Sequence, residues 1–397
     1  RYEFSQKDLC VPSLVKKLKE LCQIAASVKL RITIDAEEAD RLDLSYEILC
    51  TLMDDPEIKA WSQDMYGLGL AVQAYQKRAY PFLETVLQHS KSVKCPLHVR
   101  LVKGAYWDSE IKHAQVFGLS DYSVFTRKGN TDLSYLVCAQ LLLAHRGDVY
   151  PMFGTHNAQT VASILECAGG SYNDFEFQRL HGMGETLYAC TLKTYDVNVS
   201  LYAPVGRHES LLAYLVRRLL ENGANSSFVH KIYDTDIPVE CLATDYVTDV
   251  RSHETKRHPS IPLPCDIYGV RLNSKGIDLT DLDMTSSILS SLKIPTLPPC
   301  QDTSNVQVDE AFDVAKKAWG RWRFTSADCR GKILLSLADL LEENASDLMS
   351  LCVYEAEKTI PDAHGEIREA VDFCRYYAMQ GMKDFHESGV IMPSPTG

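Results

Sequence analysis

Up to about residue 230, short β-branched runs alternate with longer segments of helical periodicity, and this alternation is the strongest constraint on the fold. Six runs predict strands: Leu30–Asp35, Gly67–Tyr75, Leu97–Gly104, Tyr150–Thr155, Phe175–Leu180 and Val197–Tyr202. Segments between and around them predict helices, among them Leu14–Cys22, Asp40–Met53, Ala79–Leu87, Leu133–Ala144 and Ala158–Leu165. Such alternation is typical of βαβ units with a parallel sheet, and therefore of an α/β protein. A closed barrel of this kind has eight strands, two more than we find.

Polar residues stand at or just after the carboxyl ends of these runs. They are Asp35, Gln73, Arg100, Lys103, Thr155, His156, His181 and Tyr202. Binding groups converge at this edge both in a parallel barrel and in a doubly wound sheet. We favour the barrel because no Gly-x-Gly-x-x-Gly segment opens a helix after a strand.

The character of the chain changes after residue 240. Residues 241–305 are rich in proline, serine and threonine, with weak periodicity, and predict a linker with some structure of its own. Residues 306–397 form the third part, which is predicted to be helical as far as about Phe385. Thr325 and Asp328 are expected to cap one of its helices. We therefore expect three parts, with bounds 1–240, 241–305 and 306–397.

Composition excludes several classes of protein. The net charge is −12 and no run of five basic residues occurs, which argues against a nucleic-acid partner. The 13 cysteines include no Cys-x-x-Cys pair, so neither a disulfide framework nor a metal site is expected. No apolar stretch of about 18 residues and no signal peptide is present, and we expect a cytoplasmic protein that acts on a small molecule.

The segment His208–Glu221 predicts a helix with two distinct sides. Tyr214, Arg217, Arg218 and Glu221 share its polar side. Two adjacent arginines can donate several charge-assisted hydrogen bonds to one carboxylate or phosphate, and Glu221 can hold one guanidinium in place. An exposed surface with an intrahelical ion pair is the alternative, and the helix alone does not decide between them.

Two strand ends carry further candidate chemistry. Asp35 could act as a base or pair with an arginine, whereas Glu37 and Glu38 fit an acidic helix start. The run Arg100–Asp108 combines cations, Gly104 and two aromatic residues, which suits a planar anionic cofactor but also ordinary strand-end packing.

Four runs identify a family resemblance. RLVKGAYWD from Arg100, FGTHNAQT from Phe153, FEFQRLHGMGE from Phe175 and YAPVGRHESLLAYLVRRLLENGANSSFV from Tyr202 resemble the proline dehydrogenase domain of bifunctional proline utilisation A flavoproteins. EAEKT from Glu355 and EIREAVDFCRYYA from Glu366 resemble the first helices of the aldehyde dehydrogenase module of the same proteins, without that module's active site.

The resemblance implies a (β/α)8 barrel that binds FAD at the carboxyl ends of its strands and oxidises L-proline to 1-pyrroline-5-carboxylate. It implies Asp35 and Arg100 as the catalytic pair, with Arg100 near flavin N5. Flavin contacts carried over in the same way are Gln73, Arg100, Lys103, Gly104, Ala105, Trp107, Thr155 and His156. The carried-over substrate set is Tyr202, Tyr214, Arg217, Arg218 and Glu221. NAD would serve only an aldehyde dehydrogenase part, and a membrane quinone would accept the electrons in peripheral contact with the inner membrane.

The sequence departs from the family in three respects. The family has two strands and a substrate lysine before the point that corresponds to Arg1, so we expect an incomplete barrel that is either inert or completed by a separate N-terminal piece, and an oligomer is compatible with either. Gly154 stands where the family usually has alanine, and Glu357 where it has glycine.

Overall fold

The computed structural model describes residues 6–223, 243–296 and 302–385. The chain divides into two compact units, one made of residues 1–111 with 123–261 and the other of residues 112–122 with 262–397. The expected division into three parts with bounds 1–240, 241–305 and 306–397 remains a prediction.

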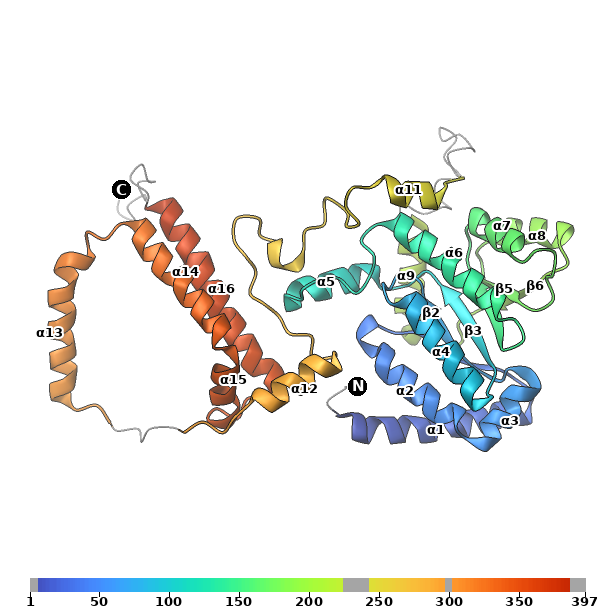
Figure 1. The fold of residues 1–397 in the computed structure, drawn as a ribbon, viewed down its shortest axis with the longest axis horizontal. Coiled ribbons are helices and arrows are strands. Elements are labelled where there is room, and N and C mark those ends of the chain that lie inside the picture. Colours follow the sequence, from blue (N-terminus) through green and yellow to red (C-terminus); the bar gives the residue numbers. More distant parts are fainter. Residues whose placement is uncertain (1–5, 224–242, 297–301, 386–397) are drawn as a thin grey trace. The chain divides into compact units, whose positions relative to one another are not determined.

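The first unit contains one sheet of six parallel strands in the order in which they occur along the chain. They are β1 (Ile32–Ile34), β2 (Leu68–Gln73), β3 (Leu97–Val102), β4 (Val149–Gly154), β5 (Glu176–Leu180) and β6 (Asn198–Tyr202). All six predicted strands are confirmed, each within a few residues of the expected bounds. Each strand pairs with the next one along the chain, and the order never reverses. Within the described residues the sheet is curled into a half-barrel (Figure 1).

Helices precede, connect and follow the strands. They are α1 (Lys7–Ser27), α2 (Leu42–Met53), α3 (Pro56–Met65), α4 (Ala79–Val93), α5 (Trp107–Phe117), α6 (Lys128–Ala144), α7 (Ala158–Cys167), α8 (Glu185–Thr194), α9 (His208–Gly223) and α11 (Tyr246–Ser252). Helix α4 packs on β2, and α6 packs on β3 and β4. Local chemistry sets the starts of some helices: Asp55 caps α3 just before Pro56, and Asn157 accepts from the Thr160 amide at α7.

Burial of apolar strand residues holds this unit together. Strand β2 is buried along its whole length, and Val99, Leu101, Phe153 and Phe177 are fully buried in the same core. A strand covered on one side by helices and on the other by the barrel interior is expected to be apolar on both sides. The polar residues of the interior are therefore exceptions that need partners.

Small residues on β2 leave room for side-chain contacts between its two neighbours. Thr33 pairs in register with Gly69, and Gly69 pairs with His98. The Thr33 hydroxyl lies 2.7 Å from His98 Nε2, directly over Gly69. His98 Nδ1 lies 2.6 Å from the Tyr66 carbonyl, which can only accept, so Nδ1 carries the proton and Nε2 accepts from Thr33. Burial lowers the pKa of His98 to about 4.

The second unit is helical. Its helices of seven residues or more are α12 (Leu282–Ser291), α13 (Asn305–Trp322), α14 (Ala327–Glu343), α15 (Ala345–Tyr354) and α16 (Ile360–Asp384), together with the last part of α5. Helices α14 and α16 pack against each other around Ala338, Ile367 and Val371. Buried Arg375 of α16 binds Glu342 of α14 at 2.9 Å.

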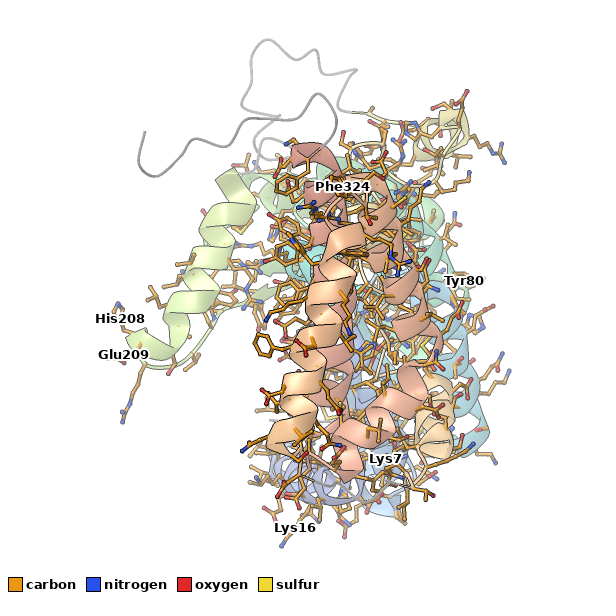
Figure 2. All side chains as sticks on the ribbon, turned by 90° about the vertical axis from the view of Figure 1, so that its left-hand side faces the viewer. Lys7, Lys16, Tyr80, His208, Glu209 and Phe324 are labelled. Atoms are coloured by element: carbon orange, nitrogen blue, oxygen red, sulfur yellow. The ribbon has the colours of Figure 1, made fainter. Side chains whose placement is uncertain are left out.

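One expected helix start is wrong by a residue. Ser326, not Thr325, caps α14, and its hydroxyl accepts from the amide of Cys329, so the contact does not involve Asp328. The serine hydroxyl has the same short reach as that of threonine, so the two adjacent residues compete for the position. Phe324, two residues before the cap, is exposed (Figure 2).

Two findings concern the described residues only. None of the helices within residues 6–223, 243–296 and 302–385 combines the length and the apolar character needed to cross a bilayer. In the same ranges, no three histidine, cysteine or acidic side chains are arranged to hold a metal ion.

Gly69 and Gly154 are expected to differ sharply in their tolerance of alanine. A Cβ on Gly69 would lie 2.1 Å from the His98 ring and 2.3 Å from its carbonyl oxygen, whereas a Cβ on Gly154 would lie 3.0 Å from a Val102 methyl. Gly69→Ala should cost about 3 kcal/mol of stability and Gly154→Ala no more than ~1 kcal/mol. Thermal denaturation of the two variants measures this, and equal midpoints would contradict it.

Candidate functional site

The centre of the site is an ion pair between side chains from two strands that are not neighbours. Arg100, on β3, donates from Nη1 to Asp35 Oδ1 at 2.9 Å, and Asp35 directly follows β1. The Arg100 side chain is 16% exposed and Asp35 is 61% exposed. The guanidinium carbon also lies 5.1 Å from the centre of the Tyr202 ring, at the end of β6. The structure therefore brings together three of the predicted residues, from the carboxyl ends of three strands.

A residue that the sequence analysis missed also holds Arg100. Gln178, on β5, accepts from Arg100 Nε at 2.8 Å, and its amide nitrogen donates to Glu176 at 2.9 Å. The alternation in Phe175–Leu180 could have revealed these residues. Glu176 and Gln178 are two apart and share one side of the strand, while Phe175 and Phe177 lie on the other side, in the core.

Gln73 and Ala105 form a second contact at this edge. The Gln73 amide nitrogen donates to the Glu37 carbonyl at 2.7 Å, and the Ala105 amide donates to the Gln73 side-chain oxygen at 3.2 Å. Gly104 between these elements has φ of 138°, and a Cβ there would lie 2.5 Å from the Tyr75 ring. Its lack of a side chain is thus required by the turn and by Tyr75.

Lys103 faces α6, on the opposite side of β3 from Arg100. Its ammonium binds Asp132, which is 4% exposed and which also accepts from Lys128 at 2.6 Å. Burial lowers the Lys103 pKa, against the attraction of Asp132. Two cations around one buried carboxylate leave a local charge of +1 beside the end of β3, which suits an anionic ligand.

Helix α9 presents its arginines to aromatic rings. Arg217 lies 4.8 Å from the centre of the Tyr106 ring, and Arg218 lies 5.3 Å from that of Tyr214. Burial raises the Tyr106 pKa, and the Tyr106 hydroxyl lies 3.4 Å from a Glu37 carboxylate oxygen. His208 and Glu209, where α9 begins, are exposed (Figure 2).

The Glu221 side chain lies outside the described residues. Its predicted contact with an arginine therefore remains a prediction.

His156 and Thr155 follow β4 and are both engaged with backbone. His156 Nε2 accepts from the Leu180 amide at 3.0 Å, so the proton of the neutral ring sits on Nδ1. Burial, with Arg218 and Arg179 nearby, lowers the pKa of His156 to about 4. Buried Thr155 accepts from the Asn157 amide at 3.2 Å. His181, the other predicted histidine, is exposed, and its amide donates to the Tyr202 carbonyl.

The remaining predicted flavin contact is Trp107, at the start of α5. Its ring nitrogen donates to the Phe125 carbonyl at 2.8 Å, and the residue is 36% exposed. The indole is thus held by one hydrogen bond while part of its surface remains open to a ligand.

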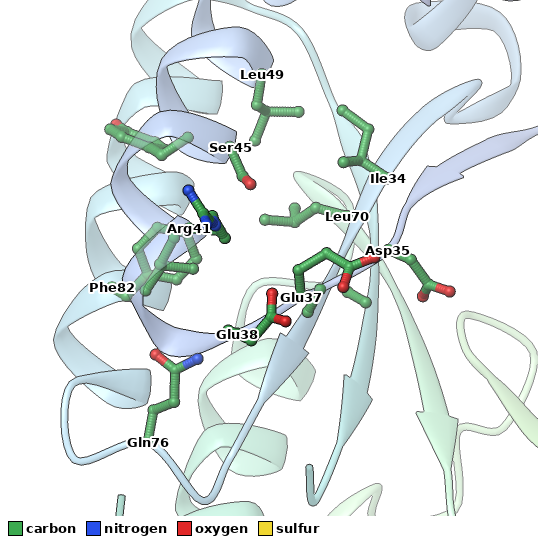
Figure 3. Close-up of a pocket in the computed structure, with 14 residues that line it drawn as sticks. Ile34, Asp35, Glu37, Glu38, Arg41, Ser45, Leu49, Leu70, Gln76 and Phe82 are labelled. Carbon is green, nitrogen blue, oxygen red and sulfur yellow. The ribbon is translucent and has the colours of Figure 1, made fainter. Parts of the chain in front are cut away.

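A small cavity lies beside the ion pair, between β1 and α2 (Figure 3). Its volume is about 20 Å³, and Ile34, Leu49, Leu70 and Phe82 line it. This volume holds about one water molecule, which is too little for a cofactor. The Asp35 carboxylate points away from Phe82 in Figure 3, so its contact with Arg100 lies on the side away from Phe82.

These groups fit a planar anionic cofactor together with a small anionic substrate. Arg100 and the Lys103–Asp132–Lys128 cluster supply positive charge, and Trp107 and Tyr106 supply flat rings. Arg217 adds a guanidinium on α9 next to Tyr106. Neutral His156 adds one donor, at Nδ1. No described group in this set is a metal site.

Two family models match the chain. The model of proline dehydrogenase matches residues 3–231, and the model of the aldehyde dehydrogenase family matches residues 295–396. The first match covers more than half of the chain, and the second lies within the helical unit.

Curated relatives match almost the whole chain. It is 41% identical over 430 residues to the bifunctional protein PutA of Salmonella typhimurium, a match that covers 97% of this chain and 32% of the relative. The PutA protein of Rhizobium meliloti is 40% identical over a match covering 92% of this chain and 32% of the relative. The chain thus spans about a third of the length of these relatives.

Solved structures are similar over the same extent. A crystal structure of a bifunctional proline utilization A protein aligns with a TM-score of 0.94 at 46% identity, covering 100% of this chain and 40% of that chain. A mutant of the Bradyrhizobium japonicum protein aligns with a TM-score of 0.93 at 45% identity, with the same two coverages.

The low pKa of His156 predicts a loss of stability in acid. The unfolded histidine, with a pKa of 6.5, takes up a proton that the folded protein takes up only near pH 4. Stability should therefore fall as the pH drops from about 6.5 to 4, by ~1.4 kcal/mol per unit of difference in pKa. His156→Gln should make this fall smaller, and exposed His181→Gln should not. Thermal midpoints across this pH range measure it, and an unchanged slope in His156→Gln would contradict it.

Proposed function

Because the chain belongs to the proline dehydrogenase family, whose members depend on a flavin, we propose that it oxidises L-proline to 1-pyrroline-5-carboxylate with FAD as its cofactor. The observation that carries the proposal is the Asp35–Arg100 ion pair beneath Tyr202, with Arg217 of α9 in contact with Tyr106. When bound, FAD would supply the acceptor for the hydride that leaves proline C5.

The substrate carboxylate would bind the α9 arginines. Adjacent guanidiniums at Arg217 and Arg218 can form several charge-assisted hydrogen bonds with one carboxylate. In the structure each lies against an aromatic ring, so a flat wall for the pyrrolidine ring adjoins each cation. We assign Tyr214, beside Arg218, and Tyr202, beside Arg100, to the walls around the pyrrolidine ring, and Glu221 to bracing the arginine pair.

The cofactor would bind across the carboxyl ends of β2, β3 and β4. We assign Arg100 to the reactive edge of the flavin, where Asp35 holds its guanidinium from the opposite side. The other assigned contacts are Gln73, Lys103, Gly104, Ala105, Trp107, Thr155 and His156. With a pKa of about 4, His156 is neutral near pH 7 and can donate a hydrogen bond from Nδ1 without adding charge.

The exposure of the two edge strands, β1 and β6, is relevant to whether further strands are needed for activity. Residues of β1 are all partly exposed, and those of β6 are all exposed or partly exposed, whereas β2 is fully buried. Edge strands with open hydrogen-bonding groups accept further strands. We therefore propose that turnover requires strands that pair with β1 and β6, and that without them the protein is inert. No second activity is proposed for residues 295–396.

The proposed reaction can be tested directly. The protein, expressed in the longest form that its gene encodes, is reconstituted with FAD and freed of excess cofactor. We expect flavin absorbance in about a one-to-one ratio and reduction of an artificial electron acceptor that depends on L-proline. Bound flavin that L-proline does not reduce would contradict the proposed substrate. Failure to retain flavin would contradict the proposed cofactor.

The proposed division of labour predicts a selective effect of Arg217→Met. Loss of a charge-assisted hydrogen bond to the carboxylate costs roughly 2 kcal/mol, which corresponds to a roughly 30-fold rise in KM for proline. The dissociation constant of FAD should change less than about threefold, because Arg217 is assigned to substrate only. Steady-state kinetics and flavin titration measure the two quantities. Exposed Arg251→Met on α11 is the matched control, and equal losses in both quantities would contradict the assignment.

A further inference from the structure

Arg100 is a partly buried cation whose orientation is set from two sides. Asp35, just after β1, accepts a hydrogen bond from Arg100 Nη1. Gln178, on β5, accepts one from Arg100 Nε. Because these nitrogens lie on different edges of a planar guanidinium, the two bonds together fix its tilt and its rotation. Asp35 is 61% exposed and Arg100 only 16%, so the Gln178 contact lies on the more enclosed side of the guanidinium.

The Gln178 amide can face Arg100 in one orientation only. Its oxygen accepts from Arg100, while its nitrogen donates to Glu176 Oε1 at 2.9 Å and to Met152 Sδ at 3.2 Å. A flipped amide would place two donors together at Arg100 and two acceptors together at Glu176. Each such mismatch leaves buried polar atoms unsatisfied, at a cost of about 1–3 kcal/mol.

Glu176 is itself held in place. It is 8% exposed. Its Oε1 also accepts from Ser200 at 2.7 Å, and its Oε2 accepts from Tyr150 at 3.4 Å and lies 3.8 Å from Arg31 Nη1. Both oxygens are therefore directed by groups from neighbouring strands, so the carboxylate offers Gln178 a fixed acceptor.

We propose that Gln178 is a positioning residue that acts through Arg100, and that Glu176 holds the Gln178 amide in the orientation this requires. The inference rests on the proposed function, in which Arg100 contacts the flavin. Gln178 and Glu176 touch neither substrate nor cofactor in this scheme. They determine where the positive charge of Arg100 stands relative to the reacting atoms, and small misplacements of such a group cost much of the rate.

A double-mutant cycle tests the inference. The four proteins are wild type, Gln178→Met, Arg100→Met and the double variant, each as the FAD-loaded protein. Methionine has nearly the length of glutamine but accepts no comparable hydrogen bond. Gln178→Met should lower kcat/KM for proline roughly 10- to 100-fold when Arg100 is present. It should lower it less than about twofold when Arg100 is already methionine, because no guanidinium remains to be positioned.

The reduction potential of the bound flavin gives a readout independent of turnover. Gln178→Met should shift it in the same direction as Arg100→Met, and the double variant should match Arg100→Met. Glu176→Gln, which is nearly isosteric, should show the same pattern with a smaller effect. Gln140→Met, on α6 away from Arg100, is the matched control and should leave both quantities unchanged.

Equal effects of Gln178→Met in the two backgrounds would overturn the inference, and so would the absence of an effect when Arg100 is present. Thermal midpoints identify a variant that is merely unstable, in which case Glu176→Gln decides. If wild type itself fails to oxidise proline, the proposed function fails, whereas the flavin potentials still show whether Gln178 acts through Arg100.

Discussion

A positive charge enclosed by a curled parallel sheet is the constraint on which the site depends. Arg100 lies on the inner side of β3 with only 16% of its side chain exposed, and an isolated charge there would be costly. The sheet compensates it with groups from β1, β5 and β6, namely Asp35, Gln178 and Tyr202. The interaction therefore ties the geometry of the site to the curvature of the sheet, since curvature changes the distances between these non-neighbouring strands.

The cationic side chains on the two sides of β3 have different kinds of partner. On the inner side, Arg100 shares hydrogen bonds with one carboxylate and one amide. On the outer side, Lys103 and Lys128 share buried Asp132. Because successive residues of a strand point to opposite sides, residues only three apart in sequence belong to separate networks. A perturbation of one network need not reach the other.

Much of this could be predicted from the sequence. The alternation of patterns predicted all six strands, and the quoted motifs predicted the resemblance to proline utilisation A proteins, which the comparisons confirm. Asp35, Arg100 and Tyr202 were expected at one edge because parallel strands end there together, and the structure places them in contact. The assigned roles of these residues remain proposals.

Other features could not be predicted, for physical reasons. Gln178 and Glu176 were overlooked because a hydrogen bond between β3 and β5 depends on curvature, which no local pattern reports. The side to which Lys103 points follows from the register of β3, and strand-end composition alone leaves it open. The cap of α14 was misplaced because adjacent hydroxyl residues give nearly the same local signal.

The small residues of β2 have a consequence for the shape of the half-barrel. Gly69 lies in register between Thr33 and His98, which meet at 2.7 Å. Ala71 lies two residues further along, in register with Arg100, and the Asp35–Arg100 pair spans the same strand. Strands separated by one other are about 9.6 Å apart in a flat sheet, so both bridges draw β1 and β3 inward over β2. Small side chains along β2 thus leave the sheet free to bend over that strand, and the distance from Asp35 to Arg100 changes with the bend.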